Sequence, residues 1–187
     1  MSIEAEAKPQ SWLQKFTAVD LITIAIFAVL LRFGFFYVYR ALSVAFPFSQ
    51  AVFPVFLAFC LTGVLALVPK GGAATLFTVA WQLINLFFQG EDVRFLLMYI
   101  PVPIVTELAF VMMKKYGDDM RSAIIGSMVY IALATVAVYF AIVYIFLMTE
   151  YTIPIALGIL ALSTLVSAPV GGYIGHKVGV QLKKLLP

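Results

Sequence analysis

Charged residues are scarce in this chain, at 11% of its 187 residues, whereas 64% are hydrophobic. Soluble domains carry about 25% charged residues, so this composition excludes an ordinary soluble domain and favours a multi-pass membrane protein. The apolar residues come in runs of about 20, the length needed to cross a hydrocarbon core of roughly 30 Å. The sequence therefore predicts an all-α integral membrane protein.

Cysteine and histidine are almost absent, with one residue of each kind. A single cysteine, Cys60, excludes an intramolecular disulfide and a multi-cysteine metal site. His176 alone cannot supply a histidine metal site, and it is the only histidine that could activate a nucleophile. The phosphate-binding motif GxxxxGK[ST] and the hydrolase motifs GxSxG and HExxH are also missing. We expect no catalytic residue, no metal, no cofactor and no ATP hydrolysis by this chain.

Breaks in the hydrophobic pattern predict six transmembrane helices. Polar connectors separate most of them, among them PKGG at 69–72, QGED at 89–92 and KKYGDDMR at 114–121. The predicted spans are 20–39, 48–68, 73–89, 95–113, 122–148 and 153–176. We expect a cytosolic or interfacial lead-in over residues 1–19, one membrane domain over 20–180 and a cytosolic tail over 181–187.

Basic residues indicate the orientation, because they are retained on the cytoplasmic side. With the N-terminus inside, that side collects nine of them: Lys8, Lys15, Lys70, Lys114, Lys115, Arg121, Lys177, Lys183 and Lys184. The outer side has Arg40 and Arg94. Both termini are therefore predicted to be cytosolic. No basic surface interleaved with aromatic residues indicates a nucleic-acid partner.

Two charged residues, Arg32 and Glu107, fall near the middle of the first and fourth spans. A charge at mid-bilayer costs at least about 2.5–3.5 kcal/mol, so it normally faces a partner or a wet cavity. One interpretation is an internal Arg32–Glu107 ion pair that holds the helices together. The other is that Glu107 recognises an amine or a cation on a solute.

Polar and aromatic side chains follow one helical face on the third and fourth spans. The fourth-span stripe contains Tyr99, Pro103, Thr106, Glu107 and Phe110, and the third-span stripe contains Thr78, Trp81, Gln82, Asn85 and Gln89. An indole and carboxamides suit a flat heterocycle, although such amides also act as interhelical glue worth about 1 kcal/mol each. The predicted substrate-binding residues are Glu107, Asn85, Gln82, Trp81, Thr78, Tyr99, Tyr130 and Ser163.

Small residues mark surfaces where helices can approach closely. Gly171 and Gly175 form a GxxxG pair in the last span, and Ala25 and Ala28 lie in the first. The pattern indicates a contact surface without naming the neighbour.

In their order and spacing, several motifs resemble the substrate-binding S-component of an energy-coupling factor (ECF) vitamin transporter. The likeness is strongest to the hydroxymethylpyrimidine and thiamine type, and it covers residues 20–180. Its motifs are RFG at 32–34, the aromatic loop after the first span, PKGGAAT at 69–75, the third-span stripe leading to QGED, TELAF at 106–110 and the glycine-rich last span.

This resemblance implies a six-helix subunit of a prokaryotic plasma membrane with a vitamin pocket in its outer half. Glu107, Asn85, Gln82 and Trp81 would face the ligand, with thiamine or hydroxymethylpyrimidine favoured. The partners would be a transmembrane T-component and two cytosolic ATPases. Ala25 and Ala28 would dock to the T-component, although they are three residues apart where many S-components have AxxxA.

A self-sufficient ion-coupled secondary transporter or channel is the alternative, with Arg32 and Glu107 as its coupling pair. The small size of the chain and the lack of a visible inverted repeat count against it.

Overall fold

The computed structural model describes residues 15–45, 52–90, 93–113, 115–117, 119–141, 143 and 153–185. Every regular element in these ranges is helical, which confirms the all-α prediction. Most of the predicted lead-in, the middle of the aromatic loop after the first span and most of the connector before the last span lie outside the described residues.

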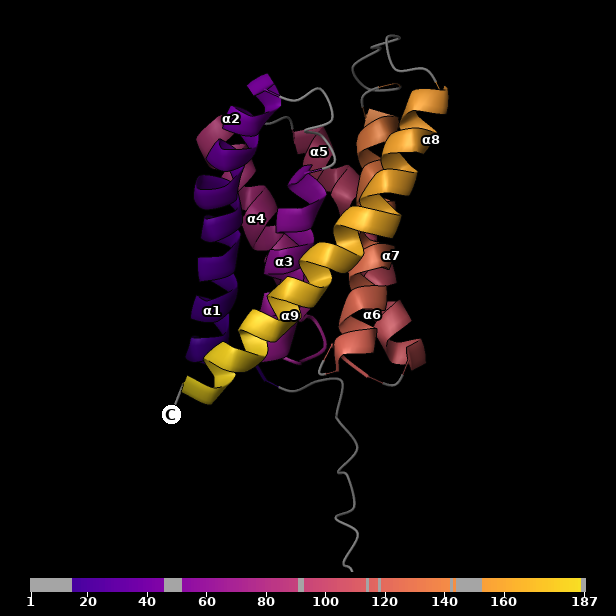
Figure 1. The fold of residues 1–187 in the computed structure, drawn as a ribbon. Helices are drawn as coiled ribbons and strands as arrows, with labels where there is room; N and C mark the ends of the chain where they lie inside the picture. Colours follow the sequence, from indigo (N-terminus) through magenta and orange to yellow (C-terminus); the bar gives the residue numbers. More distant parts are fainter. Residues whose placement is uncertain are drawn as a thin grey trace, which may run out of the picture.

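The helices form a bundle of six segments (Figure 1). The first segment is continuous and comprises α1 (Ala18–Val29), the π-helical η1 (Leu30–Phe35) and α2 (Phe36–Ala45). The middle segments are α3 (Val52–Leu67), α4 (Ala73–Gln89), α5 (Val93–Tyr99) with α6 (Pro101–Met113), and α7 (Met120–Phe140). The last is again continuous and comprises α8 (Ile153–Leu162), the π-helical η4 (Ser163–Ser167) and α9 (Ala168–Leu185).

Four of these segments are long and apolar enough to cross a membrane, namely Ala18–Leu42, Leu96–Met113, Met120–Phe140 and Leu157–Leu185. The remaining apolar helices, α3 and α4, have 16 and 17 residues. At about 1.5 Å per residue each covers most of a hydrocarbon core without exceeding it. Length and composition therefore suggest a membrane protein, and four of its described helices are long and apolar enough to cross the bilayer.

The start of α1 is fixed to the turn between α3 and α4. Thr17 caps α1 in a reciprocal box with Asp20, whose carboxylate accepts from the Thr17 amide at 2.6 Å. The Lys70 ammonium then lies 2.5 Å from the same carboxylate. The turn and the first helix are thus held together at one end of the bundle, the lower end in Figure 1.

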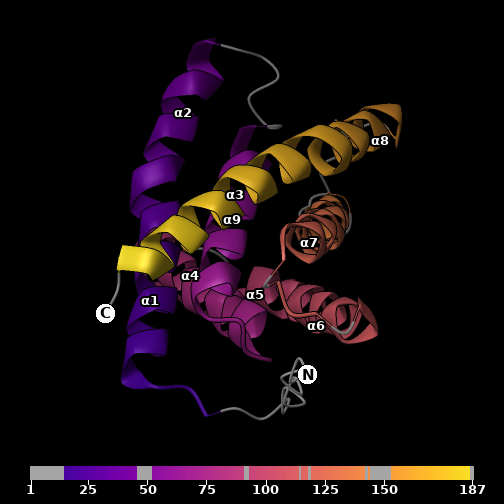
Figure 2. The same ribbon diagram turned by 60° about the horizontal axis from the view of Figure 1, so that its bottom comes forward.

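Helix α9 crosses α3 obliquely and at close range (Figures 1 and 2). A Cβ atom on Gly171 would lie 2.1 Å from the Val55 carbonyl oxygen, and one on Gly175 would lie 2.2 Å from that of Phe59. The GxxxG pair is therefore a contact surface within this chain. Only glycine lets the two backbones approach this closely.

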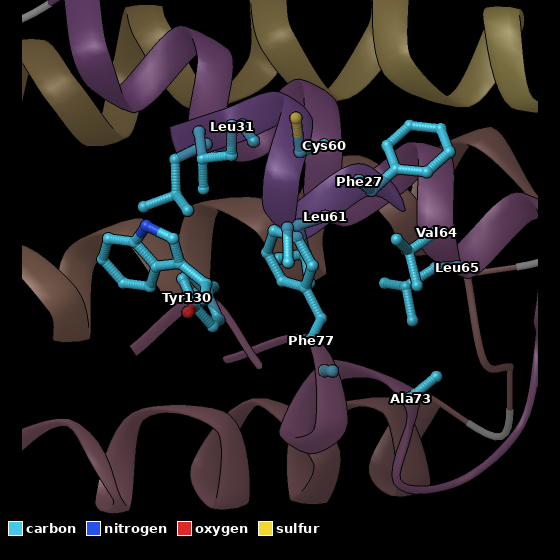
Figure 3. Packing of buried hydrophobic residues seen from close by; sticks show 14 of the residues in the cluster. Phe27, Leu31, Cys60, Leu61, Val64, Leu65, Ala73, Phe77 and Tyr130 are labelled. Atoms are coloured by element: carbon cyan, nitrogen blue, oxygen red, sulfur yellow. The ribbon is translucent and has the colours of Figure 1, made fainter. Parts of the chain in front are cut away.

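The core lies between η1, α3, α4 and α7, where Leu31, Leu61, Phe77 and Tyr130 pack together (Figure 3). The outside of the bundle is also apolar, and Phe87 and Met112 are 77% and 84% exposed. In water such a surface would be a liability, whereas in lipid it is the preferred one.

The last helix runs five residues beyond the predicted end of the membrane domain, to Leu185. Lys183 and Lys184 form its last turn. Lysine is a good helix former and its charge complements the helix C-terminus, so the helix continues after the apolar run has ended.

Candidate binding cavity

The structure contains a cavity of about 350 Å³, within the size range of small-molecule sites. It is lined by residues of η1, α2, α3, α4, α5, α7, α8 and η4. Almost every segment of the fold therefore contributes to one hollow.

One wall of the cavity consists of five aromatic side chains that contact one another in sequence. The centroid distances are 6.2 Å for Phe36–Tyr39, 5.6 Å for Tyr39–Phe53, 6.3 Å for Phe53–Trp81 and 5.4 Å for Trp81–Tyr99. Rings from α2, α3, α4 and α5 thus form a continuous aromatic surface. Such a surface suits a flat, apolar or heteroaromatic molecule.

Three polar atoms of the lining are buried without a hydrogen-bond partner in the described part of the chain: Trp81 Nε1, Asn85 Oδ1 and Ser163 Oγ. Their residues are 5%, 2% and 0% exposed. A buried polar group left unsatisfied costs about 1–3 kcal/mol, and native proteins seldom keep several together without a reason. The indole N–H donates a hydrogen bond, the amide oxygen accepts one and the hydroxyl can do both. Together they can form hydrogen bonds with a ligand that carries both donors and acceptors.

Arg32 is the one charged residue among the lining residues that the structure describes. It is 4% exposed, and its guanidinium carbon lies 3.8 Å from the centroid of the Phe36 ring. This cation–π contact places the charge against the aromatic wall.

The π-helical segments η1 and η4 each contribute a polar residue to the cavity, Arg32 from η1 and Ser163 from η4. A π turn contains an additional residue, which rotates the following side chains relative to a regular α-helix. Such turns are frequent at functional sites. Here two of them face the same hollow from segments that are far apart in the sequence.

Five of the eight predicted binding residues line the cavity: Trp81, Gln82, Asn85, Tyr99 and Ser163. Three of them, Trp81, Gln82 and Asn85, come from the predicted third-span stripe. Thr78 and Tyr130 are buried in the core and do not line it. Their hydroxyl oxygens lie 2.8 Å apart, and Thr78 also donates to the Ala74 carbonyl at 2.8 Å, so both side chains are hydrogen-bonded within the protein.

Glu107 lies away from the cavity, at the N-terminus of α4. Its carboxylate accepts from the Gly72 amide at 2.6 Å and from the amide and hydroxyl of Thr75, each at 3.0 Å. Gly72 has φ +93° and no side chain to cap the helix, so α6 supplies the missing acceptor. A carboxylate also complements the positive end of the helix dipole. The predicted Arg32–Glu107 pair does not form.

Tyr116 joins the same cap from the connection between α6 and α7. Its hydroxyl oxygen accepts from the Gly72 amide at 3.1 Å. Burial raises the pKa of the Tyr116 phenol far above its usual value, and the nearby Glu107 carboxylate raises it further. The phenol therefore stays neutral and the cap keeps its hydrogen bonds at physiological pH.

The predicted docking residues of the first helix separate into two environments. Ala25 is exposed, whereas Ala28 is 0% exposed within the core. Positions three residues apart differ by only about 60° around a helix, so the two alanines lie on either side of the boundary between the exposed and the core-facing surfaces of α1. An outside partner could contact only Ala25 in this arrangement.

Sequence reasoning missed the aromatic part of the site, namely Phe36, Tyr39 and Phe53. The signal was the dense aromatic run that follows Arg32. Residues 37–54 were interpreted as a loop or short helix at the outer edge of the membrane, and the structure continues the first helix through residues 36–45 as α2.

Comparisons with protein-family models, with curated proteins and with solved structures find no match for this chain. Within the described residues, no group of three His, Cys, Asp or Glu side chains is placed to hold a metal ion. The functional argument therefore rests on the fold and on the geometry of the cavity.

Proposed function

We propose that this chain is the membrane-embedded substrate-binding subunit of an ECF-type importer, and that it captures a vitamin or vitamin precursor from outside the cell. The observation that carries the proposal is the aromatic cavity with three buried polar atoms that the described protein leaves unsatisfied. In a dry structural core, buried polar atoms are normally hydrogen-bonded within the protein, so unsatisfied atoms in an aromatic cavity favour a ligand site. The resemblance in sequence motifs favours thiamine or hydroxymethylpyrimidine as the ligand.

In this proposal all six helical segments cross the bilayer of a prokaryotic cell, with both termini in the cytosol. The cavity and the lysine-rich end of the bundle support this orientation. The α3–α4 turn and the end of α9, which carry Lys70, Lys183 and Lys184, lie at the lower end in Figure 1, whereas the lining elements α2, α5 and α8 lie toward the upper end. The positive-inside rule then puts the cavity in the outer half, where it can collect solute.

Delivery of the ligand inward requires partners in this proposal, because the chain carries no phosphate-binding loop. These would be a transmembrane T-component and two cytosolic ATPases. The exposed side of α1 supports a docking role, since Ala25 there is bordered by the large exposed residues Ile22, Ile26 and Val29. A small residue between large ones lets a partner helix approach closely.

Native mass spectrometry of the gently purified protein tests the proposal. We expect a retained small molecule, and we expect Asn85→Leu to lose it while Phe87→Leu on the same helix keeps it. Phe87 is the matched control because it is 77% exposed on the lipid side, whereas Asn85 lines the cavity. A chain that is folded yet retains nothing, and that binds no member of a vitamin panel, would refute the proposal.

The alternative of a self-sufficient ion-coupled transporter depended on a coupling pair of Arg32 and Glu107. The structure separates these residues, with Glu107 committed to the start of α4 and Arg32 in the cavity. Uptake by proteoliposomes that contain this chain alone, driven by an ion gradient, would favour the alternative over the subunit of an importer.

A further inference from the structure

Three polar atoms in the cavity wall define a hydrogen-bonding pattern for its ligand. Trp81 Nε1 and Asn85 Oδ1 come from α4, and Ser163 Oγ comes from η4. None of the three has a hydrogen-bond partner in the part of the chain that the structure describes. We infer that the cavity recognises a small flat heterocycle with an N–H beside a ring acceptor on the edge toward α4 and a third polar group toward η4. This inference rests on the proposed binding function and narrows its ligand.

The α4 side of the cavity can bind one edge of a ring. Trp81 and Asn85 lie one helical turn apart, so their Cβ atoms are about 5–6 Å apart and both side chains can reach one small ligand. The Asn85 carboxamide has an acceptor oxygen next to a donor nitrogen, so it matches a donor beside an acceptor in either of its orientations. The Trp81 indole can only donate, and it is held by Phe53 and Tyr99 at centroid distances of 6.3 Å and 5.4 Å. A heterocycle edge with an N–H and a ring nitrogen satisfies both residues.

The Ser163 hydroxyl lacks the hydrogen bond that a hydroxyl in a helix usually makes to its own backbone. Thr135 also lines the cavity, but its hydroxyl donates to the Ile131 carbonyl at 2.8 Å. Three other buried threonines make the same bond at 2.8 Å: Thr62, Thr78 and Thr106. Ser163 is 0% exposed, and its Oγ has no such partner within the described residues. Because η4 packs on α3 and α7, a ligand would meet this hydroxyl on a side of the cavity other than α4.

The size and the wall of the cavity limit what can occupy it. Its volume of about 350 Å³ is near the lower end of the roughly 300–1,000 Å³ of small-molecule sites, so one or two rings fit. Water is the competing occupant, because ordered water often bonds to buried polar atoms. The aromatic wall favours a ring over water, because a flat ring gains stacking contacts there in addition to its hydrogen bonds.

Four probes of nearly the same shape test the α4 side: 2-aminopyrimidine, 2-methylpyrimidine, aniline and toluene. All are uncharged at neutral pH, and they carry a donor with acceptors, acceptors only, a donor only and neither. Calorimetric titration of the purified full-length protein measures their affinities, corrected for uptake by protein-free detergent micelles. We expect 2-aminopyrimidine to bind about threefold to tenfold more tightly than 2-methylpyrimidine or aniline, the range of one neutral hydrogen bond, and toluene to bind most weakly.

Asn85→Leu is expected to remove the preference for 2-aminopyrimidine over 2-methylpyrimidine. Phe87→Leu is the control on the same helix, because Phe87 is exposed on the outside of the bundle and does not line the cavity. Removal of an unpartnered polar atom should leave the Tm of Asn85→Leu unchanged or higher, whereas loss of an interhelical hydrogen bond would lower it. If Asn85→Leu fails to fold, the order of the four probes on the native chain still decides the question.

A second pair of probes tests Ser163, namely 2-amino-5-(hydroxymethyl)pyrimidine and 2-amino-5-methylpyrimidine, whose 5-substituent is opposite the amino group. We expect the hydroxyl of the first probe to raise affinity about threefold to tenfold, and Ser163→Ala to abolish this gain. Ser127→Ala is the matched control, since Ser127 is equally buried but lies outside the lining and donates to the Ile124 carbonyl at 2.8 Å. The control should keep the gain.

Failure of the inference can be distinguished from failure of the proposed function. Equal affinities for the first four probes, a preference that persists in folded Asn85→Leu, or a hydroxyl gain that is absent or persists in Ser163→Ala overturns the inference while small-molecule binding stands. If no probe binds, the molecule retained in native mass spectrometry decides, and one without a donor beside an acceptor overturns the inference. If no molecule is retained either, both fail.

Discussion

Replacement of Glu107 separates the two roles that a carboxylate in this position can have. If Glu107 caps α4, Glu107→Gln should destabilise the protein and leave ligand affinity unchanged. If Glu107 contacts the ligand, the same change should lower affinity and leave stability largely intact. The capping geometry in the structure supports the first outcome.

The magnitude follows from the three hydrogen bonds that the carboxylate accepts, two from backbone amides and one from the Thr75 hydroxyl. Glutamine keeps one acceptor oxygen but loses the charge and the second acceptor. Loss of a helix cap costs about 0.5–2 kcal/mol and the dipole interaction about 0.3–1 kcal/mol. We expect Glu107→Gln to cost about 1–2 kcal/mol. Glu107→Ala should cost about 2–4 kcal/mol, because it removes the charge and all three hydrogen bonds and leaves the Gly72 amide with the Tyr116 hydroxyl alone.

Thermal unfolding of the detergent-solubilised protein, followed by circular dichroism, measures this effect. For a chain of this size 1 kcal/mol shifts Tm by about 2–4 °C. Thr75→Val, which removes only the hydroxyl bond, should cost about 1 kcal/mol and should be non-additive with Glu107→Gln. Thr23→Val is the control, since its hydroxyl bonds the Val19 carbonyl of its own helix.

Affinity for the retained ligand is measured in parallel, well below the Tm of every variant. An unchanged Tm in Glu107→Gln together with a large loss of affinity would refute the capping argument. It would return Glu107 to the binding site that the sequence predicted for it.

Three further changes test the packing and the electrostatics. Gly175→Ala should lower Tm strongly or prevent folding, because its Cβ would lie 2.2 Å from the Phe59 carbonyl oxygen. Gly158→Ala should raise stability by up to about 1 kcal/mol, because no atom lies within 4 Å of its Cβ. Equal effects of the two variants in thermal unfolding would contradict the argument that Gly175 is required for close helix packing. Asp119 caps α7 by accepting from the Ser122 amide at 3.1 Å, and Asp119→Ala should cost about 1 kcal/mol at neutral pH. Hydrogen bonding with Ser122 and Lys115 lowers the pKa of Asp119 in the folded protein. The stabilisation that Asp119 provides is therefore complete above the unfolded-state pKa near 3.8 and is lost as the pH falls through the lower folded-state pKa. A difference in Tm between the native protein and Asp119→Ala that persists at pH 2 would contradict this. Lys70→Met should cost at most about 1 kcal/mol at low salt, since the Lys70–Asp20 pair is mostly buried but joins only one end of the bundle, and the cost should shrink as salt is added.

The third-span stripe illustrates what periodicity can predict. Trp81, Gln82 and Asn85 lie on one face of a regular helix, and the structure turns that face to the cavity. These three residues share a face because α4 is a continuous helix from Ala73 to Gln89. Within such a helix the angular relation of side chains follows from local geometry alone.

The same reasoning was wrong for the fourth span because the helix is interrupted. Tyr99 ends α5, a turn follows at Ile100, and Glu107 belongs to α6, which begins at Pro101. Proline cannot donate the backbone hydrogen bond that would continue the helix, so the register is not carried across the break. Tyr99 consequently lines the cavity while Glu107 caps another helix.

Composition and periodicity were enough to predict apolar helices suited to a lipid environment and a partner for each buried charge, because hydropathy and helical pitch are properties of neighbouring residues. The identity of each partner depended on the packing of distant segments. Glu107 meets an amide 35 residues away and Arg32 meets an aromatic wall shared by four helices, since a buried charge is stabilised by whichever dipoles the fold brings within a few ångströms. The sequence alone indicates that such a buried charge must have a partner. Which atom becomes that partner is determined by how the helices pack in three dimensions.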